Sequence, residues 1–178
     1  MSNLGVILHA GSLQNTRSID PKSMRILGEY ALVLILSGTA YYKDANGTKG
    51  VLEAGNAIIV FPDLAHAYGP CQTNDWSHTY VIFNGPQFEL LKKTGVLDSD
   101  KPIWQLDSIG YWNQRIEECL NSASQTSPAQ SLKFLGQFTQ LLIEMKTRDL
   151  ETKVDGAASR IDMATKLLSG PVAVSYTH

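Results

Sequence analysis

The chain has 178 residues, 43% of them hydrophobic, and a formal net charge of −2 at pH 7. This length suits one domain with at most a short extension, and the apolar content is sufficient for a core. The near-neutral charge does not indicate a basic surface for binding nucleic acid. No apolar run approaches the roughly 20 residues that span a bilayer. Cys71 and Cys119 lie far apart without metal-ligand spacing, a pattern typical of a reduced, cytoplasmic protein.

The first half of the chain reads as a series of β-strands. Residues 1–24 are weakly patterned, and we expect an arm, with a short strand at Gly5–His9, that leads into the following strands or folds over them. Tyr30–Tyr42 is strongly β-prone, and Gly38 within it marks a bulge or a close backbone approach. Asp44–Gly47 contains Asn-Gly, the strongest short-range hairpin signal, so Lys49–Glu53 should be the return strand.

The next stretch concentrates polar aromatic side chains on two strands. Ala57–Phe61 is apolar and β-branched, as expected for a strand buried on both faces, and Pro62-Asp63 ends it. The aromatic residues follow at two-residue intervals: His66 and Tyr68, then Trp76, His78 and Tyr80. Alternation places each set on one face of its strand. Two neighbouring strands that direct such side chains into one space are typical of a ligand pocket in a small barrel.

After Phe83 the pattern becomes helical. Gln87–Thr94 predicts a short helix, Ile103–Leu106 a last strand or a connector, and Ser108–Asn121 a second helix. Ser127-Pro128 begins the longest helix, which runs to about Arg148, because proline is favoured at the first helical position.

One apolar seam follows this long helix at alternating three- and four-residue steps. It consists of Leu135, Phe138, Leu142 and Met145, and we predict that these four residues form the contact of a homodimer. Leu132, Leu141 and Ile143 widen the apolar surface, so the helix can pack on its own barrel and on a partner. The alternative is a single wide face buried in the core of the same chain.

The remaining residues, 151–178, predict a polar linker at Glu151–Gly156 and a further amphipathic helix at Ala157–Leu168. One isolated helix of about a dozen residues is not a domain. The chain therefore divides into an N-terminal arm (1–24), a barrel (25–106), a helical dimerisation segment (107–150) and this last segment (151–178). The expected fold class is mainly β with C-terminal helices (α+β).

The order of these features resembles the N-terminal ligand-sensing domain of AraC-family transcription regulators, a cupin-like β-barrel followed by dimerising helices. The matching residues are Gly38, Ala54–Ala57, Phe61-Pro62, His66–Gly69 and Trp76–Phe83, and Ala158–Leu168 is similar to the first helix of that family's DNA-binding domain. The resemblance implies a cytoplasmic sensor of a small carbohydrate that forms a homodimer through its C-terminal helices, packed antiparallel. It also implies that DNA is contacted only through a helix-turn-helix domain, of which residues 151–178 would be the truncated beginning.

The resemblance also implies the binding residues. In the arabinose-responsive member, residues at the places of Arg25, Tyr68, His78 and Tyr80 contact the sugar, and Tyr80 replaces a tryptophan, which keeps a stacking face and adds a hydroxyl. Sugar hydroxyls suit the Arg25 donor fork and the mixed donor–acceptors His78 and Tyr68, and the flat C–H face suits Tyr80 or Trp76. His66 is the sixth predicted ligand-binding residue. Purely structural roles stay open for three of these residues. Arg25 could form an ion pair on the rim of the barrel, His66 could be a buried, hydrogen-bonded histidine, and Trp76 could be part of the barrel wall.

Two other functions stay open as well. A metal-dependent cupin enzyme usually needs a His-x-His pair, a carboxylate and a later histidine, whereas His66 is followed by Ala67 and Tyr68. We therefore expect no enzyme, no metal and no cofactor. Cys71 is near His66 and His78 in sequence, but nothing in the sequence shows that they meet. The other alternative is a dimerisation module whose barrel is filled by its own side chains.

Overall fold

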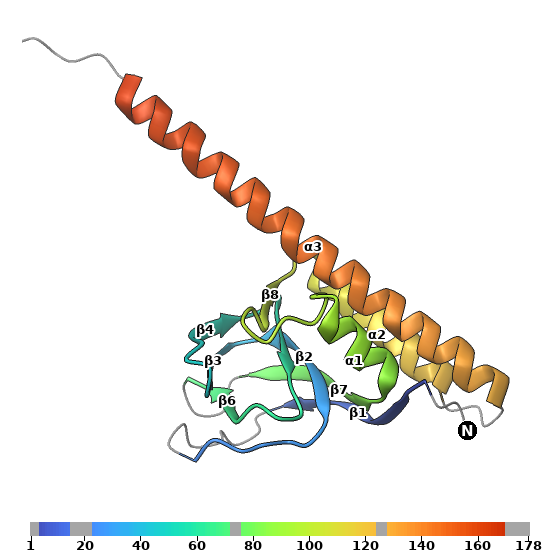
Figure 1. The fold of residues 1–178 in the computed structure, drawn as a ribbon. Helices are drawn as coiled ribbons and strands as arrows, with labels where there is room; N and C mark the ends of the chain where they lie inside the picture. The colour runs from blue at the N-terminus through green and yellow to red at the C-terminus, as the bar shows by residue number, and fades with distance from the viewer. Residues whose placement is uncertain (1–3, 15–22, 72–75, 124–127, 170–178) are drawn as a thin grey trace, which may run out of the picture.

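Eight strands and three helices make up the part of the chain described by the structure, a computed structural model (Figure 1). It describes residues 4–14, 23–71, 76–123 and 128–169, without the side chains of 121–131 and 164–169. The elements are β1 (Val6–Gln14), β2 (Tyr30–Ser37), β3 (Thr39–Asp44), β4 (Lys49–Glu53), β5 (Asn56–Val60), β6 (His66–Pro70), β7 (Ser77–Asn84), α1 (Pro86–Lys93), β8 (Ile103–Gln105), α2 (Ile109–Ala123) and α3 (Pro128–Ser169).

The strands form two antiparallel sheets, which together make up the barrel. The larger sheet has the order β1-β7-β2-β5-β8 and the smaller one β4-β3-β6. Gly38, at a φ of 76°, lies between β2 and β3, where the chain passes from the larger sheet to the smaller one. A positive φ is readily adopted by glycine, so the predicted irregularity at Gly38 is a corner of the barrel.

The central strands β2 and β5 of the larger sheet are buried on both faces, which explains their continuous apolar runs. On β2, Val33 and Ile35 belong to an inner core between the two sheets, together with Tyr42 of β3 and Leu52 of β4. The alternate residues of β2 belong to an outer core between the larger sheet and the helices. The fold class is therefore mainly β with C-terminal helices, as the sequence predicted.

Helix α3 contributes the seam Leu135, Phe138, Leu142 and Met145 to this outer core, and these side chains are at most 3% exposed. The prediction that they form the contact of a homodimer is wrong, because their surface is already covered by the chain's own sheet and helices. A helix that covers a barrel must bury one apolar stripe against it, and this seam is that stripe.

The predicted linker at Glu151–Gly156 is also wrong, because α3 continues through it without a break to Ser169. Figure 1 shows α3 lying along the barrel and α2 over its first part and then projecting beyond them. Solvated polar residues are compatible with a helix as well as with a linker, so composition alone did not distinguish the two. Residues 15–22 of the expected arm and 170–178 of the last segment lie outside the described residues.

The other predicted elements agree closely with the structure. Lys49–Glu53 is β4, the turn at Asp44–Gly47 joins β3 to β4, and Gly55 has the positive φ of 94° that its turn requires. The strand in the arm is longer than Gly5–His9, since β1 reaches Gln14 and pairs with β7. None of the described helices is long and apolar enough to cross a membrane.

Candidate ligand-binding site

Strands β6 and β7 direct alternate side chains into the barrel. On β7, Tyr80 and Ile82 pack against the inner core, whereas Val81 and Phe83 belong to the outer core. His78 precedes Tyr80 by two residues and therefore shares its inward face. Tyr68 of β6 also packs against the inner core. The alternation read from the sequence thus places both sets of polar aromatic residues inside the barrel.

The five predicted aromatic residues form one continuous cluster. Trp76 stacks on His78 with ring centroids 4.3 Å apart. Tyr68 lies 6.3 Å from Trp76 and 6.5 Å from His78. His66 stacks on Tyr68 at 6.0 Å, and Tyr80 lies 6.4 Å from His78. Residues from two strands and from the segment before β7 are therefore brought together around the inner core.

Both histidines of the cluster are buried and neutral at pH 7. His78 is 3% exposed, burial lowers its pKa to about 4, and its Nδ1 has no hydrogen-bond partner among the described residues. Burial also lowers the pKa of His66. The Nδ1 of His66 lies 3.1 Å from the carbonyl oxygen of Leu64, which can only accept, so this nitrogen carries the proton. Nε2 of the neutral ring is then an acceptor, and it has no partner among the described residues.

Arg25 lies beside the cluster because its backbone pairs with His66. The two residues exchange backbone N–H···O hydrogen bonds of 2.9 Å in an isolated bridge. Burial raises the pKa of the Tyr68 hydroxyl, and the charge and hydrogen bond of Arg25 oppose that rise. The exposed Arg25 side chain therefore reaches the Tyr68 hydroxyl from the solvent side. It forms no ion pair within the part of the chain that the structure describes.

Sequence reasoning missed two inward residues on β3, directly opposite β6. Tyr42 faces Tyr68 and Asp44 faces His66 in the strand register. The Tyr42 hydroxyl donates to Asp44 Oδ2 at 2.9 Å, and Asp44 Oδ1 accepts from the backbone N–H of Thr48 at the same distance. Asp44 is 2% exposed, so this carboxylate belongs to the barrel lining as well as to the hairpin turn. Alternation through Ala40, Tyr42 and Asp44 was the signal that could have identified both.

Strand β1 covers one side of the same cluster. Gly11 pairs with Tyr80 and Leu13 pairs with His78 across the β1–β7 ladder. A side chain added at Gly11 would place its Cβ 3.5 Å from the Tyr80 hydroxyl. The absence of a side chain at position 11 therefore leaves the inner face of Tyr80 uncovered by this strand.

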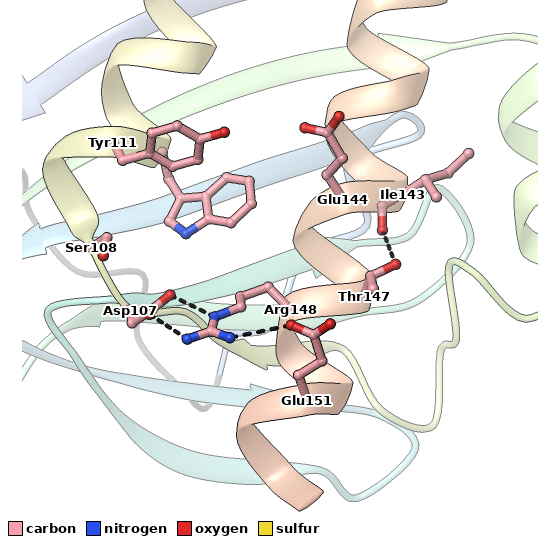
Figure 2. A pocket seen from close by; sticks show the side chains of 9 residues that line it. Asp107, Ser108, Tyr111, Ile143, Glu144, Thr147, Arg148 and Glu151 are labelled. Carbon is pink, nitrogen blue, oxygen red and sulfur yellow. Dashed lines mark hydrogen bonds and ion pairs between the residues drawn. The ribbon is translucent and has the colours of Figure 1, made fainter. Parts of the chain in front are cut away.

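A concave surface that the sequence did not predict lies between α2 and α3 (Figure 2). This groove has a volume of about 550 Å³. Arg148 crosses it with hydrogen bonds of 2.9 and 2.5 Å to the two carboxylate oxygens of Asp107 and one of 3.2 Å to Glu151. The bonded guanidinium of Arg148 lowers the pKa of Asp107. Glu144, also in the groove, pairs with Arg115 at 2.9 Å, and the exposed apolar lining comes from Tyr111 and Ile143.

The histidines, cysteines and acidic residues were the candidates for metal or thiol chemistry. Among the described residues, no three side chains of His, Cys, Asp or Glu are grouped as a metal site would require. Cys71 is exposed and Cys119 is buried, and both are free thiols. Burial raises the pKa of the Cys119 thiol.

Comparison with curated protein sequences gives no significant match. Among solved structures, the AraC-like transcriptional activator CuxR has a TM-score of 0.48 and 8% identity, covering 80% of this chain and 50% of CuxR. ToxT from Vibrio cholerae O395, bound to (E)-4-(8-methylnaphthalen-1-yl)but-3-enoic acid, has a TM-score of 0.46 and 11% identity, covering 80% and 58%. A predicted oxalate decarboxylase from Thermotoga maritima has a TM-score of 0.33 and 22% identity, covering 41% and 61%.

The family comparison covers most of the barrel and the part of α3 that packs on it. The sequence profile of the AraC-like ligand binding domain matches residues 17–148, which is well over half of the chain. The chain therefore belongs to the AraC-like ligand binding domain family.

Proposed function

We propose that this domain is the effector-binding and dimerisation part of a bacterial AraC-type transcription regulator, and that it senses a small carbohydrate inside the barrel. The observation that supports this most directly is the pair of buried, neutral histidines. Each has one ring nitrogen without a partner among the described residues, and each lies against the Tyr68 ring. A buried polar atom without a partner costs about 1–3 kcal/mol, which a hydroxyl-rich ligand would offset.

The surrounding groups suit a sugar in three respects. His66 Nε2 is an acceptor for a sugar hydroxyl, and the Tyr68 and Tyr80 hydroxyls can both donate and accept. The rings of Tyr80 and Trp76 offer flat faces for the C–H side of a pyranose or furanose. Arg25 adds guanidinium donors on the solvent side. Hydroxyls beside neutral imidazoles suit a neutral, polar ligand, and the described residues hold no group of three His, Cys, Asp or Glu side chains that could bind a metal ion.

In the proposed regulator this domain does not contact DNA itself. Its net charge of −2 is unsuited to the phosphate backbone, so DNA contact is assigned to helix-turn-helix units. We further propose that the regulator acts in the cytoplasm as a homodimer joined through the C-terminal helices. Since the seam Leu135–Met145 is buried in the chain's own core, the dimer contact must use another face of α3.

A panel of neutral mono- and disaccharides, screened by the melting temperature of the purified domain, tests the proposal. The sugar that raises the melting temperature is then titrated by calorimetry into His78→Ala and Tyr80→Phe. His78→Ala should weaken binding by about one to two orders of magnitude, since loss of one hydrogen bond is worth roughly 1–3 kcal/mol. Tyr80→Phe should weaken binding as much if its hydroxyl bonds the sugar, and less if the ring only stacks.

Tyr111→Phe removes a hydroxyl from an exposed side chain of α2, outside the aromatic cluster. It is the matched control and should bind the sugar like the parent. Unchanged affinity in both barrel variants, with the fold preserved, would remove the site from this face of the barrel. No melting response to any sugar would instead favour the dimerisation module without a ligand. Metal analysis of the purified protein addresses the enzyme alternative, because a bound equivalent of metal would support it.

A further inference from the structure

Strand β3 brings a buried carboxylate, that of Asp44, into the barrel. Asp44 is 2% exposed, and its two hydrogen bonds come from the Tyr42 hydroxyl and from the backbone N–H of Thr48. Both donors are neutral, and Asp44 forms no ion pair anywhere in the described part of the chain. Charged side chains in protein interiors are normally paired, because an uncompensated charge is costly to remove from water. The hairpin turn therefore accounts for one oxygen of Asp44 but not for its charge.

His66 lies directly across from Asp44 in the β3–β6 ladder, where β3 ends and β6 begins. Both backbone groups of His66 hydrogen-bond to Arg25 on its other side, so Asp44 and His66 form a non-hydrogen-bonded pair. In such a pair the Cα atoms are only about 4.5 Å apart and the side chains are close. Burial lowers the pKa of His66, and the Asp44 carboxylate opposes that fall. The imidazole and the carboxylate therefore share one end of the barrel interior.

The side chains at this end have acceptors to offer and no free proton. Neutral His66 donates its Nδ1 proton to the carbonyl oxygen of Leu64, so its buried Nε2 is an acceptor, without a partner among the described residues. The carboxylate of Asp44 can only accept. Burial and the charge of Asp44 raise the pKa of the Tyr42 hydroxyl, which therefore keeps its proton and donates it to Asp44. The remaining capacity of the Tyr42 oxygen is that of an acceptor.

A primary ammonium matches these acceptors in both hydrogen bonding and charge. It carries three donors, no acceptor and one positive charge. A sugar hydroxyl or a water molecule can donate to the same atoms but brings no charge to offset that of Asp44. The rings of Tyr42 and Tyr68 are neighbours across the same ladder, and tyrosine faces attract cations. Charge-assisted hydrogen bonds are also roughly twice as strong as neutral ones.

Arg25 determines which way round such a ligand lies. It pairs with His66 on the side of β6 opposite to β3, and its charge and hydrogen bond act on the Tyr68 hydroxyl. Neighbouring strands are about 4.8 Å apart, so the backbones of Arg25 and Asp44 are about 10 Å apart. An ammonium is therefore attracted to the Asp44 side and repelled from the Arg25 side, whereas sugar hydroxyls suit the guanidinium donors.

We propose that Asp44, His66 and Tyr42 form a subsite for a primary amine, and that the effector is an amino sugar. This rests on the carbohydrate sensing proposed above and narrows its ligand class. The amine takes the place of one sugar hydroxyl and donates to the Asp44 carboxylate and to His66 Nε2. The remaining hydroxyls of the sugar bind at Tyr68 and Arg25. The carboxylate that holds the hairpin turn thus also selects a ligand with one positive charge.

Sugars that differ in a single group test the subsite in the parent protein. D-glucosamine, D-galactosamine and D-mannosamine are compared with D-glucose, D-galactose and D-mannose, first by melting temperature and then by calorimetry, at about pH 6.5. At least one amino sugar should bind about 10- to 100-fold more tightly than its neutral counterpart. Equal affinity within every pair that binds overturns the amine subsite and leaves carbohydrate sensing standing. No response to sugars of either kind overturns both.

Asp44→Asn assigns the preference to this carboxylate. Asparagine keeps an oxygen for the Thr48 N–H but has no charge, so the amino sugar should bind about 10- to 100-fold more weakly and the neutral sugar less than about 5-fold more weakly. Asp63→Asn is the matched control, because it removes an exposed carboxylate that pairs with Lys92, and it should leave both affinities within about 3-fold.

An equal loss for both sugars in Asp44→Asn would show that Asp44 acts only through the fold, and would overturn the subsite. The melting temperature of the unliganded variant identifies a folding defect. If Asp44→Asn does not fold, the paired sugars in the parent protein still decide the question, because they change the ligand and leave the chain intact.

Discussion

The hydroxyl of Thr79 on β7 donates a hydrogen bond of 2.7 Å to the side-chain oxygen of Asn113 on α2. Because its proton is used there, Thr79 accepts at 2.9 Å from the hydroxyl of Ser12 on β1. Thr79 lies between His78 and Tyr80 on β7 and points to the opposite face of that strand. The strand that bears two candidate ligand contacts is therefore hydrogen-bonded on its outer face to β1 and to α2. A shift of β7 on ligand binding would therefore reach α2 directly.

Thr79→Val removes this link while keeping the shape of the side chain. We expect the free energy of unfolding to fall by about 1 kcal/mol, because Asn113 and Ser12 each lose a partner in a partly buried place. Urea unfolding measures the change. Ser37→Ala, which breaks the exposed Ser37–Ser77 hydrogen bond of 2.7 Å, is the control and should stay within about 0.5 kcal/mol of the parent. Equal losses in the two variants would contradict a special role for Thr79.

Asp149 is the anchor that holds α3 on β8. Its side chain is fully buried, accepts from the backbone N–H of Gln105 at 2.8 Å, and pairs with Lys146 at 3.3 Å and Lys153 at 2.6 Å. Asp149→Ala leaves that N–H and the largely buried Lys146 amine unpaired, and should lower the free energy of unfolding by about 3 kcal/mol. Chemical denaturation gives the value.

The comparison for Asp149 is Glu151, two residues along the same helix. Its ion pair with Arg148, at 3.2 Å, is exposed, so Glu151→Ala should cost no more than about 0.5 kcal/mol. If Asp149→Ala proved equally mild, the buried carboxylate would not be what fixes α3 to the sheet.

Two glycines should respond to alanine in opposite directions. At Gly55 the φ is 94°, and an added Cβ would lie 2.7 Å from the carbonyl oxygen of Leu106. Gly55→Ala should therefore destabilise the fold by about 2 kcal/mol or more. Gly136 lies within α3 with no atom within 4 Å of an added Cβ, so Gly136→Ala should stabilise by about 0.5–1 kcal/mol. Melting temperatures of the two variants check the signs, and a shift in the same direction for both would refute this account.

Stability should fall as the pH is lowered from 6.5 to 4. The pKa of His78 is about 4 in the fold against an ordinary value of 6.5, so in this window the unfolded chain binds a proton that the folded chain does not. The lowered pKa of His66 acts in the same direction. Urea midpoints between pH 7.5 and 4.5 should decline less steeply for His78→Gln than for the parent. Identical slopes would mean that His78 titrates normally in the fold.

The sequence predicted the barrel well because its strands have strong local signals. Asn46-Gly47 sets one hairpin, and the two-residue spacing of His78 and Tyr80 sets the inward face of β7. These signals depend on the period of a strand and on turn chemistry, both of which are local. The ring cluster around Tyr68 could be predicted for the same reason.

The helical part of the fold was harder to predict, because an apolar pattern along a helix does not show which neighbour each face packs against. Phe138 and Ile143 both read as apolar, and only the three-dimensional packing shows that the first faces the barrel and the second faces outward. Asp149 had no sequence signal of burial, since the backbone N–H of Gln105 reaches it only when α3 docks on β8. The groove beside Arg148 depends on the same docking.

The unbroken length of α3 also converts a small rotation into a large displacement. From Leu150 to Ser169 the helix extends about 30 Å beyond its anchor at Asp149, at 1.5 Å per residue. A tilt of about 5° at that anchor would move the distal end by roughly 3 Å, about the length of a hydrogen bond. If residues 151–156 were a flexible linker, the tilt would be lost there. Because α3 is continuous, the tilt is instead carried to its end at Ser169.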